Sequence, residues 1–164
     1  MTLKGPPMQI REFRPSDAAA LAQIFHAAVH GIGARDYRPE QLRAWSPEPA
    51  PAAAWARRAA DGRRVFVAAD TQNQPQAFIE LELDGHIDCF YCHPQVAGTG
   101  TGSALYERLE AEARSLGLKS LFVEASEAAR RFFLRQGFTV ETRREIERRG
   151  VALHNYRMTK ELAV

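Results

Sequence analysis

Three glycines at alternate positions, Gly98, Gly100 and Gly102, separate a strand-like segment from a helix-like one. Residues 87–92 are mainly apolar and aromatic, and leucine or alanine recurs at helical spacing from Leu105 to Leu116. Glycine permits positive φ and lets a ligand approach the bare backbone. The first N–H groups of a helix have no internal acceptor and lie at the positive end of its dipole. This arrangement therefore predicts an anion site suited to a phosphate or pyrophosphate.

The spacing of the loop does not fit two familiar phosphate-binding loops. A P-loop has Lys and then Ser or Thr after its last glycine, whereas Ser103-Ala104 follows Gly102 here. The dinucleotide fingerprint has glycines at positions 1, 3 and 6, and the sixth position counted from Gly98 is Ser103. Neither of these loops is therefore predicted.

A second block follows further along the chain. Residues 121–126 have the composition of a strand, and Ala129, Phe132 and Phe133 follow at helical spacing. Gly137 stands where a helix C-terminal cap is expected, with Phe138 after it.

Together the two blocks resemble the GNAT superfamily of N-acetyltransferases. The coenzyme A loop of that family reads Gln/Arg-x-x-Gly-x-Gly/Ala, and Gly100 and Gly102 match its two small positions, whereas Ala97 replaces the Gln or Arg. The later block resembles Asn-x-x-Ala-x-x-Phe-Tyr-x-x-x-Gly-Phe, with Ser126 at the Asn position and Phe133 at the Tyr position.

The resemblance covers nearly the whole chain, from about Met8 to Leu162. It implies a mixed α+β fold of the GNAT type, in which helices flank a largely antiparallel sheet. In that family the sheet splays beside the glycine loop, and the acyl thioester enters the gap.

The periodicity of the chain predicts elements in an order consistent with this fold. Ser16 or Asp17 is expected to cap the first helix, and Asp84-Gly85 is expected to form a hairpin turn. The expected strands are 9–13, 65–68, 77–83, 86–92, 119–123, 138–147 and 151–160, and the expected helices after the first are 40–45, 52–60, one from about 105, and 127–136.

The length, net charge and apolar runs of the chain predict its number of domains, its kind of partner and its location. The 164 residues suit one domain, expected over 8–164 after a disordered or extended tail at 1–7. With 22 basic and 20 acidic residues, the net charge of +2 is too balanced to favour a nucleic-acid partner. The sequence contains no apolar run of membrane-spanning length, and its N-terminus lacks the apolar core of a signal peptide. We therefore expect a cytoplasmic protein.

Cys89 and Cys92 form a C-x-x-C with His86 and His93 beside it, which invites a zinc or redox interpretation. Residues three apart on a regular strand point to opposite faces, and a closed zinc site needs four ligands on one side. We therefore expect no metal, with both cysteines as small apolar residues.

The resemblance implies that acetyl-CoA is the cosubstrate and that an acetyl group passes to an amine of a small molecule or peptide. The alternative is a non-catalytic acyl-CoA-binding regulatory module that kept the fold. The resemblance does not decide between a monomer and a homodimer. Residues expected at the coenzyme are Phe90, Tyr91, Cys92, Ala97, Gly98, Thr99, Gly100, Thr101, Gly102, Ser103, Ser126 and Phe133.

Acetyl transfer to an amine needs a base, a donor to the carbonyl oxygen and an acid for the thiolate. In this family the donor is usually a backbone N–H of the strand before the loop, which implies Phe90, Tyr91 or Cys92. The acid in many relatives is the Tyr replaced here by Phe133, so Ser126, Tyr91, Tyr156 or water is expected instead.

The choice of base stays open. His86 and Asp88 lie on one face of their strand if it is regular. Histidine has a suitable ordinary pKa, and burial can raise that of an aspartate. Asp88 is the first candidate, for proton transfer or substrate binding, and His86 the second. Glu80, Glu82 and Glu124 are further candidates.

The acceptor is expected to bind at the first helices and their loop. An aromatic and basic rim there suits a small amine or the carboxylate of an amino acid. Ordinary packing of the loop is the alternative, above all for Trp45. The charged run 143–149 is expected to be a solvated hairpin. Expected acceptor residues are His30, Tyr37, Trp45 and Asp88, with Arg38 and Trp55 in the same region.

Overall fold

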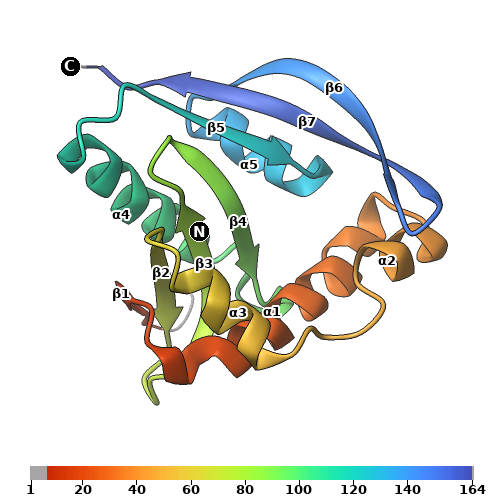
Figure 1. The fold of residues 1–164 in the computed structure, drawn as a ribbon, viewed down its shortest axis with the longest axis horizontal. Coiled ribbons are helices and arrows are strands. Elements are labelled where there is room, and N and C mark those ends of the chain that lie inside the picture. Colours follow the sequence, from red (N-terminus) through yellow and green to blue (C-terminus); the bar gives the residue numbers. More distant parts are fainter. Residues whose placement is uncertain (1–6, 164) are drawn as a thin grey trace.

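In the computed structural model, which describes residues 7–163, seven strands form one sheet in the order β1-β2-β3-β4-β5-β7-β6 (Figure 1). Neighbouring strands are antiparallel except for β4 and β5, which run parallel. The mixed α+β architecture and the largely antiparallel sheet are therefore confirmed. The strands are β1 (Gln9–Glu12), β2 (Arg64–Ala69), β3 (Pro75–Leu81), β4 (His86–Cys92), β5 (Ser120–Ala125), β6 (Thr139–Arg148) and β7 (Val151–Glu161).

Helices cover both faces of the sheet. The helices α1 and α3 pack on one face against β3 and β4, and α4 and α5 share the core on the opposite face. The α-helices are α1 (Ala18–Gly31), α2 (Pro39–Trp45), α3 (Ala52–Ala59), α4 (Thr101–Ser115) and α5 (Glu127–Arg135), and the 3-10 turns are η1 (Pro15–Asp17), η2 (Gly33–Arg35) and η3 (Pro94–Val96).

The sequence of β2 shows why the sheet is covered twice. Val65 and Val67 pack with α1 and α3, whereas Phe66 and Ala68 pack in the core that contains α4. Successive residues of a strand point to opposite faces, and all four of these are buried. A continuous apolar run is typical of a strand that has helices on both sides.

The strands β4 and β5 separate soon after they meet. Their pairing is confined to His86 with Phe122 and Ile87 with Val123, whereas β5 pairs with β7 along its whole length. Figure 1 shows β4 running away from β5 toward α1. The expected splay of the sheet is confirmed, and it lies directly before the glycine loop.

The strand β4 is not regular. Glu80 of β3 lies opposite Cys89 and Leu81 lies opposite Ile87, so Asp88 is the extra residue of a β-bulge. Ile87 packs with the α4 core and Cys89 with the α1 core, although residues two apart share a face in a regular strand. The bulge therefore reverses which face each later residue of β4 occupies.

Several boundaries differ from those expected. The strand β3 begins earlier and ends at Leu81, because Glu82 to Gly85 form the turn. The helix α4 begins at Thr101, so Gly102 lies in its first turn rather than in the loop. The tail expected over residues 1–7 lies outside the described residues apart from Pro7, and the single domain over 8–164 stays a prediction. Over residues 7–163, no helix has the length and apolarity needed to span a membrane.

Replacing Gly85 by alanine is expected to destabilise the fold by more than the ordinary cost of a positive φ. Gly85 has φ +100°, and a Cβ there would lie 2.5 Å from the carbonyl oxygen of Ser120. Gly117→Ala is the matched control, because Gly117 has φ +75° and open space around its Cα. We expect the control to lose about 1 kcal/mol in urea unfolding and Gly85→Ala distinctly more. Equal losses would show that the contact with Ser120 relaxes freely.

Candidate functional site

Two cavities meet where β4 and β5 separate. The first, here called the loop cavity, has a volume of about 350 Å³ and lies between α1, η2, η3, the glycine loop and α5. The second, here called the hairpin cavity, has a volume of about 380 Å³ and is closed on one side by β6 and β7. Residues that line both are Tyr37, Trp45, Phe90, Tyr91, Ser126 and Ala129.

The glycine loop presents bare backbone to the loop cavity. Gly98 and Gly100 have φ of +76° and +91°, and a Cβ on either would meet no atom within 4 Å. Gly100 is the N-cap of α4, whose first hydrogen bond runs from the Ala104 N–H to the Gly100 oxygen at 3.1 Å. The preceding N–H groups of the first turn have no acceptor within the helix, as an anion site requires.

Gly102 is needed for the packing of α4 as well as for access of a ligand to the backbone. A Cβ at this position would lie 3.0 Å from the Phe90 ring and 3.4 Å from the Phe132 ring. Gly102 therefore lets α4 approach β4 and α5 closely, while its backbone still lines the loop cavity.

Most residues expected at the coenzyme line the loop cavity, and three do not. The Thr99 hydroxyl donates to the Val96 oxygen at 2.6 Å and lies 3.0 Å from the Thr101 hydroxyl, so both threonines hold the loop in shape. Phe133 is fully buried among Phe90 and other aromatic rings, and it lines the hairpin cavity instead. The residues that do line the loop cavity are Phe90, Tyr91, Cys92, Ala97, Gly98, Gly100, Gly102, Ser103 and Ser126.

Ser126 and Tyr91 stand at the junction of the two cavities. The Ser126 hydroxyl accepts a hydrogen bond from the Ala129 N–H at 3.3 Å, because Ser126 is the N-cap of α5. This leaves its proton free to point elsewhere. Tyr91 packs edge-on against Phe25, and burial raises the pKa of the Tyr91 hydroxyl.

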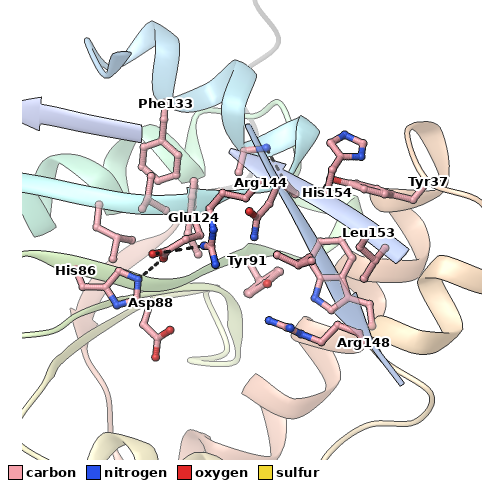
Figure 2. Close-up of a pocket in the computed structure, with 18 residues that line it drawn as sticks. Tyr37, His86, Asp88, Tyr91, Glu124, Phe133, Arg144, Arg148, Leu153 and His154 are labelled. Atoms are coloured by element: carbon pink, nitrogen blue, oxygen red, sulfur yellow. Dashed lines mark hydrogen bonds and ion pairs between the residues drawn. The ribbon is translucent and has the colours of Figure 1, made fainter. Parts of the chain in front are cut away.

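His86 is held between two carboxylates. Its Nε2 contacts Glu124 (Figure 2). Its Nδ1 lies 2.7 Å from Glu82, and the ring stacks on Phe122. The hydrogen bond to Glu124 is the main cause that raises the pKa of His86, to about 9, and it lowers the pKa of Glu124. At neutral pH His86 is therefore a cation, which makes it unsuited to accept a proton from the amine. Its side chain is also half-buried.

Asp88 faces two arginines. Its Oδ2 accepts hydrogen bonds from Arg58 at 2.7 Å and from Arg63 at 2.8 Å. Burial favours the neutral acid, but the two guanidinium groups outweigh it and lower the pKa of Asp88. Asp88 is therefore ionised at neutral pH, and it lines the hairpin cavity with His86 although β4 is irregular between them.

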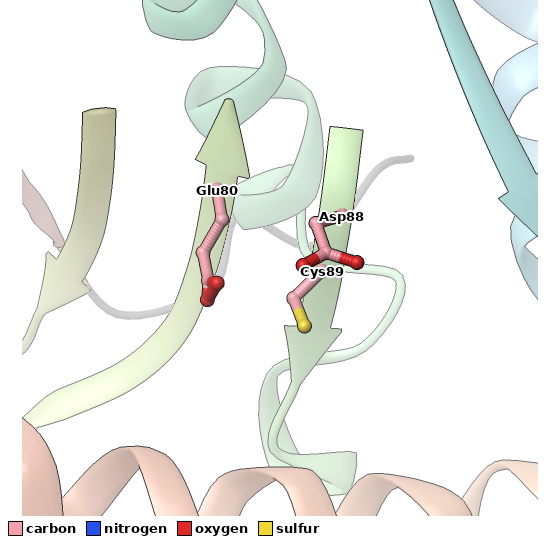
Figure 3. A group of neighbouring side chains, drawn as sticks. All are labelled: Glu80, Asp88 and Cys89. Carbon is pink, nitrogen blue, oxygen red and sulfur yellow. The ribbon is translucent and has the colours of Figure 1, made fainter. Parts of the chain in front are cut away.

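The same arginines occupy the centre of a group of side chains whose types could bind a metal ion. Glu80, Asp88 and Cys89 bring one ligand atom each to within 4.8 Å of one another (Figure 3). Arg58 donates to all three, to Cys89 at 3.1 Å. A cation bound there would have to displace Arg58. Cys92 lies on the opposite face, in the core that contains α4, so the two cysteines diverge as expected.

The hairpin of β6 and β7 contributes a basic wall that was expected to be solvated. Arg144, Ile146 and Arg148 line the hairpin cavity (Figure 2), whereas Arg143 and Glu145 pair with each other in solvent at 3.1 Å. Alternate residues of a strand point to opposite sides, so only one face of the charged run is solvated. Arg144 and Arg148 are therefore lining residues that no motif in the sequence indicated.

A network at the start of α5 joins the hairpin to the helices. The Glu127 carboxylate accepts from Tyr156 at 2.7 Å and contacts His154 at 2.6 Å, and the Tyr37 hydroxyl donates to the His154 main-chain oxygen at 3.1 Å. Burial opposes ionisation, but these bonds and Arg130 lower the pKa of Glu127 to about 2. Tyr156 is thus engaged with Glu127 and does not line either cavity.

Part of the expected acceptor region lies away from the cavities. Tyr37 and Trp45 line both cavities, and their binding of the acceptor stays a prediction. His30 instead contacts the Ser46 main-chain oxygen at 2.7 Å, and Trp55 is buried in the core with Phe78. His30 and Trp55 are close in sequence to the helices that line the site, but the residue after α2 engages the first and the core between α1 and the sheet buries the second.

Comparisons with known proteins agree on the family. The family described as acetyltransferase (GNAT) domain matches residues 33–160. The uncharacterized N-acetyltransferase YafP of Escherichia coli K12 is 32% identical over 154 residues, which are 92% of this chain and 94% of that protein.

Solved structures show the same fold. A GCN5-related N-acetyltransferase from Rhodopseudomonas palustris, whose description also reads aminotransferase, class II, superposes with a TM-score of 0.88 at 34% identity, over 99% of both chains. The PaiA N-acetyltransferase from Thermoplasma acidophilum, in complex with coenzyme A, has a TM-score of 0.77 at 16% identity, over 95% of this chain and 99% of that chain.

We expect the charge on His86 to stabilise the fold up to alkaline pH. Its pKa is raised from an ordinary 6.5 to about 9, so the contribution is complete below about pH 6.5 and is lost as the pH rises through about 9. The free energy of urea unfolding should therefore fall more between pH 6.5 and about 9.5 in the wild type than in His86→Gln. Parallel pH dependences in the two proteins would contradict the ion pairing.

Proposed function

The chain belongs to the GNAT acetyltransferase family, and we propose that it transfers the acetyl group of acetyl-CoA to an amine of a small molecule or peptide. In this reaction the amine nitrogen bonds to the acetyl carbon, the carbon–sulfur bond breaks, and the amine loses a proton while coenzyme A leaves as thiol. The amine attacks the thioester directly, without an acetylated side chain.

The observation that carries the proposal is the junction of the two cavities. The loop cavity has the bare glycine backbone for a phosphate-bearing ligand, and the hairpin cavity has the charged groups for a small polar one. Both reach Phe90, Tyr91 and Ser126, at the place where β4 leaves β5. Two ligands bound in this way would meet end to end, and the reaction needs that arrangement.

The residues of the loop cavity fit the coenzyme. Gly98 and Gly100 would hold the pyrophosphate by backbone N–H groups, because side chains there would occupy the open space that their Cα atoms now face. Beyond Ile87, β4 has no partner on the β5 side, so backbone groups of Tyr91 and its neighbours can pair with an extended ligand arm. The bound ligand supplies the activated acetyl group.

The charged groups of the hairpin cavity would handle the amine. Asp88 and Glu124 are ionised at neutral pH, and although arginines and His86 already pair with them, their oxygen atoms can also accept hydrogen bonds from an ammonium group, whose proton passes to solvent. His86 supports this by keeping Glu124 charged, rather than by acting as the base. Ser126 lines both cavities, and its hydroxyl can donate a proton to the departing sulfur. A thiol has a pKa of about 8.5, so a weak donor or water suffices where relatives have Tyr in place of Phe133.

Release of coenzyme A thiol from acetyl-CoA should depend on an added primary amine. A panel of amines tested with a thiol-detecting reagent measures this directly, and mass spectrometry of the product should show one added acetyl group on the amine. Thermal stabilisation by coenzyme A, with no amine-dependent thiol release, would favour a non-catalytic acyl-CoA-binding module instead.

Gly100→Val should weaken coenzyme A binding by at least tenfold, or about 1.4 kcal/mol. The substitution fills open space at the loop and places a β-branched residue at φ +91°. Gly62→Val is the matched control, because Gly62 has φ +98° and open space but lies in the turn before β2. Isothermal titration of each folded variant gives the affinity. Wild-type affinity in Gly100→Val would remove the loop from the coenzyme site.

A further inference from the structure

The basic wall of the hairpin cavity carries positive charge that the protein itself leaves unmatched. Among residues 7–163, Arg148 has no carboxylate within 4.0 Å, and its Nη1 donates only to the neighbouring Glu147 main-chain oxygen at 3.1 Å. Arg144 lies 3.8 Å from Glu124, a carboxylate that His86 and Arg157 already contact.

The carboxylates that line the hairpin cavity already have cationic partners other than Arg148. Asp88 is bound by Arg58 and Arg63, and Glu124 by His86. The lining carboxylates therefore do not neutralise Arg148, and a ligand anion would be its natural partner. A guanidinium group binds a carboxylate through two parallel hydrogen bonds, which makes such a pair strong and directional.

Arg148 is on a strand end that is fixed to the helices. The Arg149 Nη1 donates to the Ala44 main-chain oxygen at 2.6 Å, and the Gln41 amide donates to the Ala152 main-chain oxygen at 3.0 Å. Leu153 lies beside Arg148 in Figure 2, and Trp45 adds a second apolar side chain to the cavity lining. Arg148 is four positions after Arg144 on β6, about 13 Å along the strand, so Arg148 lies at the end of the cavity away from Glu124, which Arg144 contacts.

We propose that the acceptor is a small amine that also carries a carboxylate, and that Arg148 binds this carboxylate. This rests on the proposed acetyl transfer. The ammonium group lies toward Asp88 and Glu124, and an apolar body between the two charged ends packs on Trp45 and Leu153. An α-amino acid with an apolar side chain has this chemistry, and the cavity volume of about 380 Å³ is at the lower end of the range for small-molecule sites.

Matched pairs of amines test the class of substrate. L-phenylalanine, L-leucine and L-methionine are each compared with the amine that lacks the carboxylate, namely 2-phenylethylamine, 3-methylbutylamine and 3-(methylthio)propylamine. We expect kcat/KM to be at least about tenfold higher for the amino acid in one pair or more, the scale of a charge-assisted hydrogen bond. A preference for the decarboxylated amine in every pair would overturn the proposal and leave acetyl transfer intact.

Variants of β6 test whether Arg148 causes the preference for the amino acid over the decarboxylated amine. In Arg148→Gln the ratio of kcat/KM between the members of a pair should fall toward one, mainly through KM for the amino acid. Arg143→Gln is the control, since Arg143 is on the same strand but pairs with Glu145 in solvent. An unchanged ratio in Arg148→Gln would overturn the assignment.

Binding gives a readout that does not need turnover. Isothermal titration of L-phenylalanine in the presence of coenzyme A should give an affinity that Arg148→Gln weakens about tenfold and Arg143→Gln leaves unchanged. If none of the three amino acids binds, the substrate class is wrong. If coenzyme A does not bind and no amine is acetylated, the proposed function itself fails, which is a distinct result.

Discussion

The limited contact between β4 and β5 is the constraint on which the rest of the site depends. A parallel pair that ends after Ile87 leaves the backbone of the later part of β4 without a partner on that side. A soluble protein rarely leaves such an edge inside its fold, because unpaired N–H and C=O groups are costly once they are buried. The gap is therefore best explained as a place for a ligand, and both cavities open onto it.

A second constraint is the clamp that Arg58 and Arg63 form on Glu80 and Asp88. Glu80 is almost completely buried, and a buried carboxylate without a cation would be strongly destabilising. The bulge in β4 gives Asp88 a position where it shares these arginines. One charged cluster thereby links α3, β3 and β4 and fixes one wall of the hairpin cavity.

The sequence predicted the fold well because its signals are local. The glycine run and the glycine that follows the end of α5, Gly137, identify elements by spacing alone, and the apolar run in β2 is typical of a strand buried on both faces. The bulge at Asp88 has no such signal, since it depends on register with β3. The partners of His86 come from β5 and the preceding turn, so its charge state could not be read from its neighbours in sequence. In the charged run of β6, Ile146 is the one apolar residue on the face with Arg144, and a single apolar residue is too weak a signal to distinguish that face from the solvated one.

Because β6 is at the outer edge of the sheet, its residues can contribute to ligand recognition while contributing little to folding stability. It pairs with β7 alone, and most of its residues are exposed, so its side chains support little of the core. The glycine loop is different, because Gly102 and Phe90 tie it to the packing of α4. Mutations can therefore accumulate on β6 at small cost in folding stability, while those at the loop are constrained. A lineage with this architecture can change what its outer hairpin recognises and still keep the inner half of the site intact.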